Sequence, residues 1–142
     1  MSRLTRQVAM RRLMSGVAGD VVDYGDLEFL LGEQFEAALR HQGARLGELA
    51  ERIGLLCDVL EVRRQQRVEL VEQLLGPGAR MDAVFPLMLG SARTSLEAHW
   101  QALELRIVEC QRLAKRNSDL LVDQYSLMQR VLHGEEQLYA PG

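Results

Sequence analysis

The fold is decided by residues 96–131, which read LEAHWQALELRIVECQRLAKRNSDLLVDQYSLMQRV. Apolar side chains recur along this stretch at alternating steps of four and three residues. That spacing is the period of an α-helix that packs along its whole length against other helices. The resulting seam consists of Leu96, Trp100, Leu103, Ile107, Cys110, Ala114, Asn117, Leu121, Gln124, Met128 and Val131. We therefore expect an all-α protein, an antiparallel bundle of long helices with coiled-coil-like packing.

A second repeat of the same kind lies earlier in the chain, at Leu39, Gln42, Leu46, Leu49, Ile53, Leu56 and Leu60. Its apolar phase continues through Gly43 and Gly47, which favours a kink at Gly43, although a turn between two helices there stays open. The clearest break is Gly76-Pro77-Gly78, because proline cannot continue a helix and glycine permits a tight reversal. We expect residues 81–89, which are strongly apolar, to form a short helix that caps the bundle.

These signals predict the organisation of the whole chain. Gly16, Gly19 and Gly25 suggest a flexible connection, Asp26 is a plausible N-cap, and Gly134 is expected to end the last helix. The predicted parts are a basic N-terminal arm or short helix at 1–22 and a bundle domain at 23–142. Within that domain we expect long helices at about 26–75, kinked or split near 43, and at 91–133. A connection at 76–90 and a tail at 134–142 complete it.

The composition favours a helical protein of modest size. The chain has 142 residues, of which 47% are hydrophobic and 5% aromatic, with only three prolines. Its net charge is −3, although residues 1–12 hold four arginines and no acid. A nucleic-acid-binding protein usually carries a much larger basic surplus. No stretch resembles a signal peptide or a membrane span, so we expect a cytoplasmic protein without stable membrane insertion.

The sequence contains no pattern typical of catalysis. None of the three histidines, His41, His99 and His133, has Glu three residues before it, as a carboxylate-bridged metal site in a helical bundle requires. Phosphate-binding glycine loops and nucleophile elbows are also missing. Cys57 and Cys110 fall in apolar helical stretches and are expected to be core thiols. We expect no enzyme activity, no metal and no cofactor.

Arg63 and Arg67 stand where the second repeat would place leucine. The simpler hypothesis is that their stems lie along the surface, or that they pair with acids of their own helix, namely Glu61, Glu69 and Glu72. The alternative is a dedicated anion site.

The last helix has a wider apolar face than one seam requires. On a helical wheel this face spans an arc of about 160°, whereas packing on one side of a small bundle needs about 100°. The excess could contact a third helix of the same chain, a second copy of the chain, or a foreign amphipathic helix. The residues of this face are Leu120, Leu121, Tyr125, Leu127, Met128, Val131 and Leu132.

Two amides interrupt the apolar stripe one heptad apart, at Asn117 and Gln124. Polar groups in such a stripe cost stability unless they are hydrogen-bonded. Two roles stay open for them: fixing the register of the helices, or recognising the backbone of a partner.

The chain resembles the FlgN family of flagellar export chaperones over about residues 27–142. The similarity rests on Leu30-Leu31 with Glu33, on Ala38-Leu39, on the heptads that lead into Arg63-Arg64, and on Trp100 with Leu103. Its most specific part is Asn117 followed by Leu120-Leu121, and the tail Tyr139, Pro141 and Gly142 echoes the family's ending. The arm at residues 1–22 has no clear counterpart.

The resemblance implies a chaperone of type III flagellar export that binds the C-terminal amphipathic helices of hook–filament junction proteins. Such a chaperone prevents premature assembly and delivers its client to the cytoplasmic domain of the export gate. The alternative is a self-associating coiled-coil structural or adaptor bundle, for instance a homodimer, without a client. The expected partner-binding residues are Asn117, Leu120, Leu121, Gln124, Leu127, Met128, Val131 and Tyr139.

Overall fold

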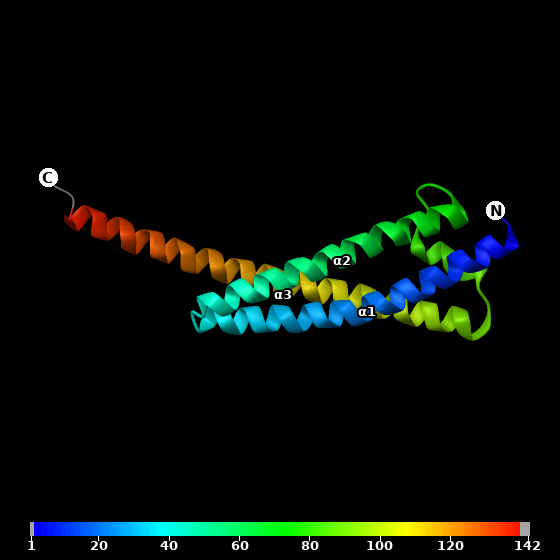
Figure 1. The fold of residues 1–142 in the computed structure, drawn as a ribbon, viewed down its shortest axis with the longest axis horizontal. Helices are drawn as coiled ribbons and strands as arrows, with labels where there is room; N and C mark the ends of the chain where they lie inside the picture. Colours follow the sequence, from blue (N-terminus) through cyan, green and yellow to red (C-terminus); the bar gives the residue numbers. More distant parts are fainter. Residues whose placement is uncertain (1, 140–142) are drawn as a thin grey trace.

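A computed structural model describes residues 2–139 of the protein, with side chains described for residues 2–135. It contains the helices α1 (Arg3–Leu39), α2 (Gly43–Leu75) and α3 (Gly90–Tyr139) and the short 3-10 helix η1 (Met81–Leu87). Figure 1 shows α2 running antiparallel to α1, and α3 returning in the direction of α1. The backbone of α1 lies against both α2 and α3. The predicted all-α bundle with antiparallel long helices is confirmed.

α1 begins far earlier than the sequence suggested. Ser2 caps it, since the Ser2 hydroxyl accepts a hydrogen bond from the Thr5 backbone N–H at 3.1 Å. The helix then continues unbroken to Leu39, so the predicted separate arm at 1–22, the flexible glycine connection and the N-cap at Asp26 are wrong. The physical reason is packing: Ala9, Leu13 and Val17 are buried in the core that α1 shares with α2, η1 and α3.

Glycine in the middle of α1 gives space for arginines of the neighbouring helices. A Cβ atom at Gly19 would lie 3.3 Å from the guanidinium of Arg63 on α2. A Cβ atom at Gly25 would lie 3.5 Å from the guanidinium of Arg106 on α3, which pairs with Glu28 at 2.9 Å. Two of the three glycines that suggested a flexible connection, Gly19 and Gly25, therefore permit close helix contacts, which offset their low helix propensity.

A tight turn, and not a kink, separates α1 from α2. His41 adopts the left-handed conformation with φ of 54°. The N–H of His41 donates to the Ala38 carbonyl at 3.2 Å and the N–H of Gln42 to the Ala37 carbonyl at 2.9 Å, which is the bonding pattern of a Schellman motif. The favoured kink at Gly43 is therefore wrong. The chain reverses at His41, and glycine usually occupies the left-handed position of such a turn.

The second reversal follows the sequence signals closely. α2 ends at Leu75, and Gly76 and Gly90 both have positive φ, of 92° and 62°, which glycine adopts without strain. Between them η1 buries Met81 and Val84 against the end of the bundle, as expected for a capping helix.

α3 does not end at His133 but continues through Gly134 to Tyr139. With 50 residues it is about 75 Å long. Its C-terminal part therefore extends beyond the turn that joins α1 to α2 (Figure 1), and no separate tail begins at residue 134.

A buried ion-pair cluster joins the three long helices. Asp20 on α1 is 1% exposed, and its two carboxylate oxygens accept hydrogen bonds from Arg63 at 3.3 Å and from Arg67 at 2.6 Å. Arg63 also pairs with Asp23, and the Arg67 guanidinium lies 5.3 Å from the ring centre of Trp100 on α3. The predicted partners on α2 itself are wrong, since these arginines reach across to acids of α1.

The two cysteines differ. Cys110 is buried, and loss of solvation raises the pKa of its thiol to about 11. Cys57 is exposed, so its prediction as a core thiol is wrong. The apolar neighbours of Cys57 in the sequence indicate a helix but not which side of that helix faces the core.

Candidate functional site

Side chains of α3 donate hydrogen bonds to backbone carbonyls of α1 at three places. The donors lie one heptad apart on α3, and the acceptors lie one heptad apart on α1. The three bonds are Cys110 to Tyr24 O at 3.5 Å, Asn117 to Leu31 O at 2.8 Å, and Gln124 to Ala38 O at 2.9 Å. Because the spacing is the same on both helices, this ladder fixes α1 and α3 in one parallel register.

The amide of Asn117 is satisfied within the chain. It is buried, and besides Leu31 O its Nδ2 donates to Gln34 Oε1 at 2.9 Å. Its Oδ1 accepts from Arg116, whose guanidinium lies 3.8 Å from the ring centre of Phe35. The intramolecular partners of Asn117 and Gln124 favour a role in register, so backbone recognition by these amides gains no support from their surroundings.

Replacing Asn117 by Leu tests this role directly. We expect affinity for a helical partner to stay within about twofold and the free energy of unfolding to be unchanged or higher, because polar residues in a seam fix register at a cost in stability. Calorimetry of the variant, alone and titrated with the partner, measures both quantities. A large loss of affinity in a variant that unfolds no more easily than wild type would instead assign Asn117 to recognition.

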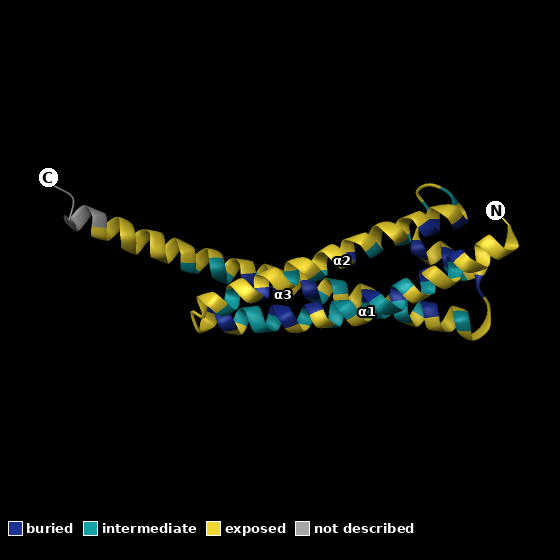
Figure 2. Ribbon diagram, viewed as in Figure 1, coloured by how far each residue is buried: buried dark blue, intermediate teal, exposed yellow. Residues whose placement is uncertain are grey.

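Beyond Gln124 the seam of α3 continues without a partner among the described residues. α1 ends at Leu39, one residue after the carbonyl that Gln124 contacts. Leu127, Met128 and Val131 are 55%, 48% and 56% exposed. Figure 2 shows α3 as exposed from residue 125 to residue 135, in contrast to the middle of the helix. These side chains are therefore not core residues of the bundle.

An apolar groove lies beside this free segment. It has a volume of about 460 Å³, and its lining comes from all three long helices: Leu31, Gln34, Ile53, Ala114, Ser118, Leu121, Val122 and Tyr125. On the wheel of α3, Leu121 and Tyr125 share a stripe with Met128 and Leu132. One apolar surface thus runs from the groove outward along α3, with the exposed Val131 and Leu127 at one edge of it, and we call it the α3 face.

The residues predicted to bind a partner differ in their exposure. Leu120 and Leu121 are half-buried, whereas Leu127, Met128 and Val131 are exposed. Asn117 and Gln124 point toward α1, and the side chain of Tyr139 lies outside the described part of the structure.

The groove also takes side chains from α1 and α2, which the sequence did not indicate. Leu31 and Ile53 line the groove although neither belongs to the last helix. The second repeat contains Ile53, which indicates an apolar seam there. No local signal shows that this part of α2 lies across from α3.

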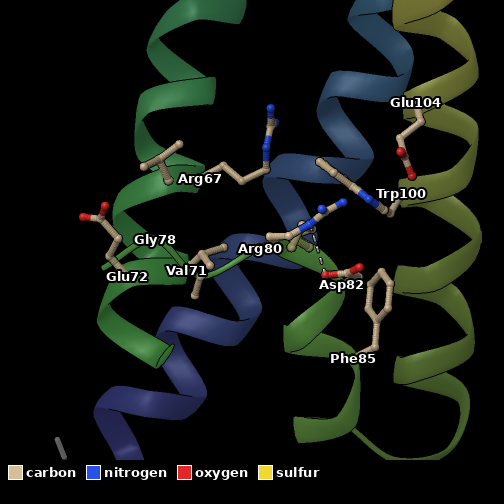
Figure 3. A pocket seen from close by; sticks show the side chains of 12 residues that line it. Arg67, Val71, Glu72, Gly78, Arg80, Asp82, Phe85, Trp100 and Glu104 are labelled. Carbon is tan, nitrogen blue, oxygen red and sulfur yellow. Dashed lines mark ion pairs between the residues drawn. The ribbon is translucent and has the colours of Figure 1, made fainter. Parts of the chain in front are cut away.

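A second hollow, of about 510 Å³, lies at the other end of the bundle between α2, η1 and α3 (Figure 3). Phe85, Trp100 and Val71 line it together with charged residues. Arg80 pairs with Asp82 at 3.8 Å and Arg67 with Asp20, whereas Glu72 and Glu104, which also line the hollow, form no ion pair with a described residue. The hollow is therefore lined by charges of both signs.

The described residues contain neither a metal-binding cluster nor a candidate membrane span. No three or more His, Cys, Asp or Glu side chains of residues 2–135 come together in a way that could hold a metal ion. In the same part of the chain, no helix combines the length and hydropathy that crossing a membrane requires.

Comparison with known proteins gives one match. A family model described as FlgN protein matches residues 10–134. No curated protein and no solved structure matches the chain. The matched range begins in the first turns of α1, so the expectation that residues 1–22 lack a family counterpart is wrong from residue 10 onward. It ends before Tyr139 and therefore does not cover the tail.

Proposed function

Because the chain belongs to the FlgN family of flagellar export chaperones, we propose that it acts in the cytoplasm on hook–filament junction proteins. It binds their C-terminal amphipathic helices, prevents their premature assembly and delivers them to the cytoplasmic domain of the export gate. The family is one of chaperones and not of enzymes, and a binding role needs no catalytic group. The observation that carries the proposal is the unpartnered α3 face.

The α3 face suits an amphipathic helix better than it suits a small molecule. It is long, largely apolar and continuous with a groove, which is the geometry of helix-in-groove recognition. The backbones of α2 and α3 each lie against α1 but not against each other. A client helix in the groove would take the place of a fourth helix and bury the apolar stripes of both proteins.

The same contact explains how a chaperone of this kind prevents assembly. An amphipathic helix that assembles through coiled-coil contacts exposes one apolar stripe. While that stripe lies on Leu121, Tyr125 and Met128, it is not available to other copies of the client. Release at the export gate would then restore it. Tyr139, at the end of α3, stays a proposed partner-binding residue.

Hydrogen exchange on the full chain mixed with a hook–filament junction protein of the same flagellum tests the proposal. We expect a one-to-one complex by light scattering, and slower exchange across residues 118–135 than in the free chain. The reason is that an unsupported helix end opens readily and becomes protected once a partner packs on it. The first turns of α1, far from the face, should exchange at the same rate in both samples and serve as an internal control.

Two results would contradict this proposal. Complex formation without added protection at 118–135 would place the client elsewhere. If the free chain self-associates through the α3 face and forms no complex with the junction protein, the self-associating bundle is the correct function.

A further inference from the structure

We propose that the opposite end of the bundle is a second docking site, for an acidic amphipathic helix of another protein. This basic end consists of the first four turns of α1 together with residues 87–92. It shares no residue with the α3 face, and the proposal stands whether or not that face binds a client.

Unpaired positive charge is concentrated at the basic end. Residues 1–19 contain Arg3, Arg6, Arg11 and Arg12 but no Asp or Glu. All four arginines are exposed, and none forms an ion pair with any described residue. Most arginines further along the chain do pair with an acid. A partner that complements the charge of this end is therefore an acidic one.

A hollow lies among these charges. It has a volume of about 470 Å³ and is formed by α1, the end of η1 and the start of α3. Its apolar lining includes Met10, Met14 and Met88, and Arg6 and Arg11 stand at its polar side. Methionine adapts its shape to different apolar groups and is common at surfaces that bind helices.

Exposed apolar side chains extend the hollow. Leu89 is 85% exposed between η1 and α3, next to the left-handed Gly90, and Leu4 is 68% exposed on α1. An apolar side chain held this far from the core gains nothing from its position in the isolated chain. Leu4, Leu89 and the methionines together match the apolar stripe of a helix, while the arginines match acids on either side of that stripe.

The concave shape favours a helical peptide over a membrane surface. A hollow of this volume accepts large side chains from a narrow partner, whereas a bilayer presents a broad surface that cannot enter it. Anionic lipid is therefore the competing occupant that the experiment must distinguish from the peptide.

The test measures binding of a fluorescein-labelled synthetic helical peptide that carries Leu and Phe on one face and Glu at its flanks. We expect Arg6→Glu/Arg11→Glu to weaken its binding to the full chain by about tenfold or more, because the charges at the site reverse. Leu89→Ser should weaken it by about fivefold through lost apolar contact. The variants should stay folded, since the side chains of Arg6, Arg11 and Leu89 are all exposed.

The matched control is Arg52→Glu/Arg130→Glu, which changes the net charge of the chain equally at two other arginines without an ion pair. We expect this variant to bind the peptide within about twofold of wild type. Equal losses in the two double variants would show unspecific attraction and overturn the proposal. No binding of the peptide to wild type would also overturn it. Binding of phosphatidylglycerol vesicles in place of the peptide would assign the site to a membrane.

Discussion

Replacing Asp20 by Ala is expected to lower the free energy of unfolding by about 3 kcal/mol and the melting temperature by roughly 10 °C. The carboxylate is buried, and its loss leaves Arg67, whose side chain is only 15% exposed, without its ionic partner. Arg63 keeps Asp23 and is closer to solvent. We therefore expect a loss in the free energy of unfolding at the lower end of the range for a broken buried ion pair. Denaturant unfolding followed by circular dichroism measures the change.

Asp26→Ala is the matched control for this prediction. Asp26 lies on the same helix, is exposed and has no ion pair with a described residue, so its removal should change the free energy by less than about 0.5 kcal/mol. Asp20→Leu/Arg67→Met removes both charges together and should recover most of the lost stability. If Asp20→Ala costs no more than Asp26→Ala, the cluster does not hold the helices together.

The helical period made the fold class predictable, and the reversal at Gly76–Gly90 followed from residues that cannot continue a helix. Both signals are local. The turn at His41 was harder, because histidine in the left-handed conformation leaves no mark that distinguishes it from histidine in a helix. The interruption was instead predicted at Gly43, two residues later.

At the start of α1 the sequence indicated a break in the helix that the structure does not have. Gly16, Gly19 and Gly25 suggested a flexible connection, because glycine has low helix propensity. The chain is helical there because Leu13 and Val17 are buried and because glycine lets Arg63 and Arg106 approach closely. These are contacts between segments far apart in the sequence, and a period along one helix cannot reveal them.

The candidate site was predictable only in part, because it too depends on contacts between segments far apart in the sequence. The width of the apolar arc on the last helix indicated a surface for more than one partner, and the exposure of Leu127 and Val131 agrees with that. Whether the additional apolar surface of the last helix faces another helix of the chain depends on where α1 ends. Only the three-dimensional arrangement shows that α1 stops at Leu39 while α3 continues, and that Ile53 of α2 closes one side of the groove.

The α3 face leads to the prediction with the largest expected effect on binding. Leu127→Ser/Val131→Ser should weaken the affinity for a hook–filament junction protein by about 100-fold. The two side chains could each lose about 1.5 kcal/mol of apolar burial in the complex, near the lower limit for such residues, and every 1.4 kcal/mol is tenfold in affinity. Isothermal titration of the full chain with the junction protein measures this loss.

The fold should survive these substitutions, because both side chains are more than half exposed beyond the end of α1. Leu105→Ser/Val108→Ser is the matched control: these residues lie on the same helix, are 67% and 63% exposed, and occupy the side of α3 away from the seam. We expect it to bind as wild type does. The two double variants remove almost the same apolar surface from α3. A difference between them therefore reports the position of the client, whereas equal losses would mean that apolar surface anywhere on this helix suffices.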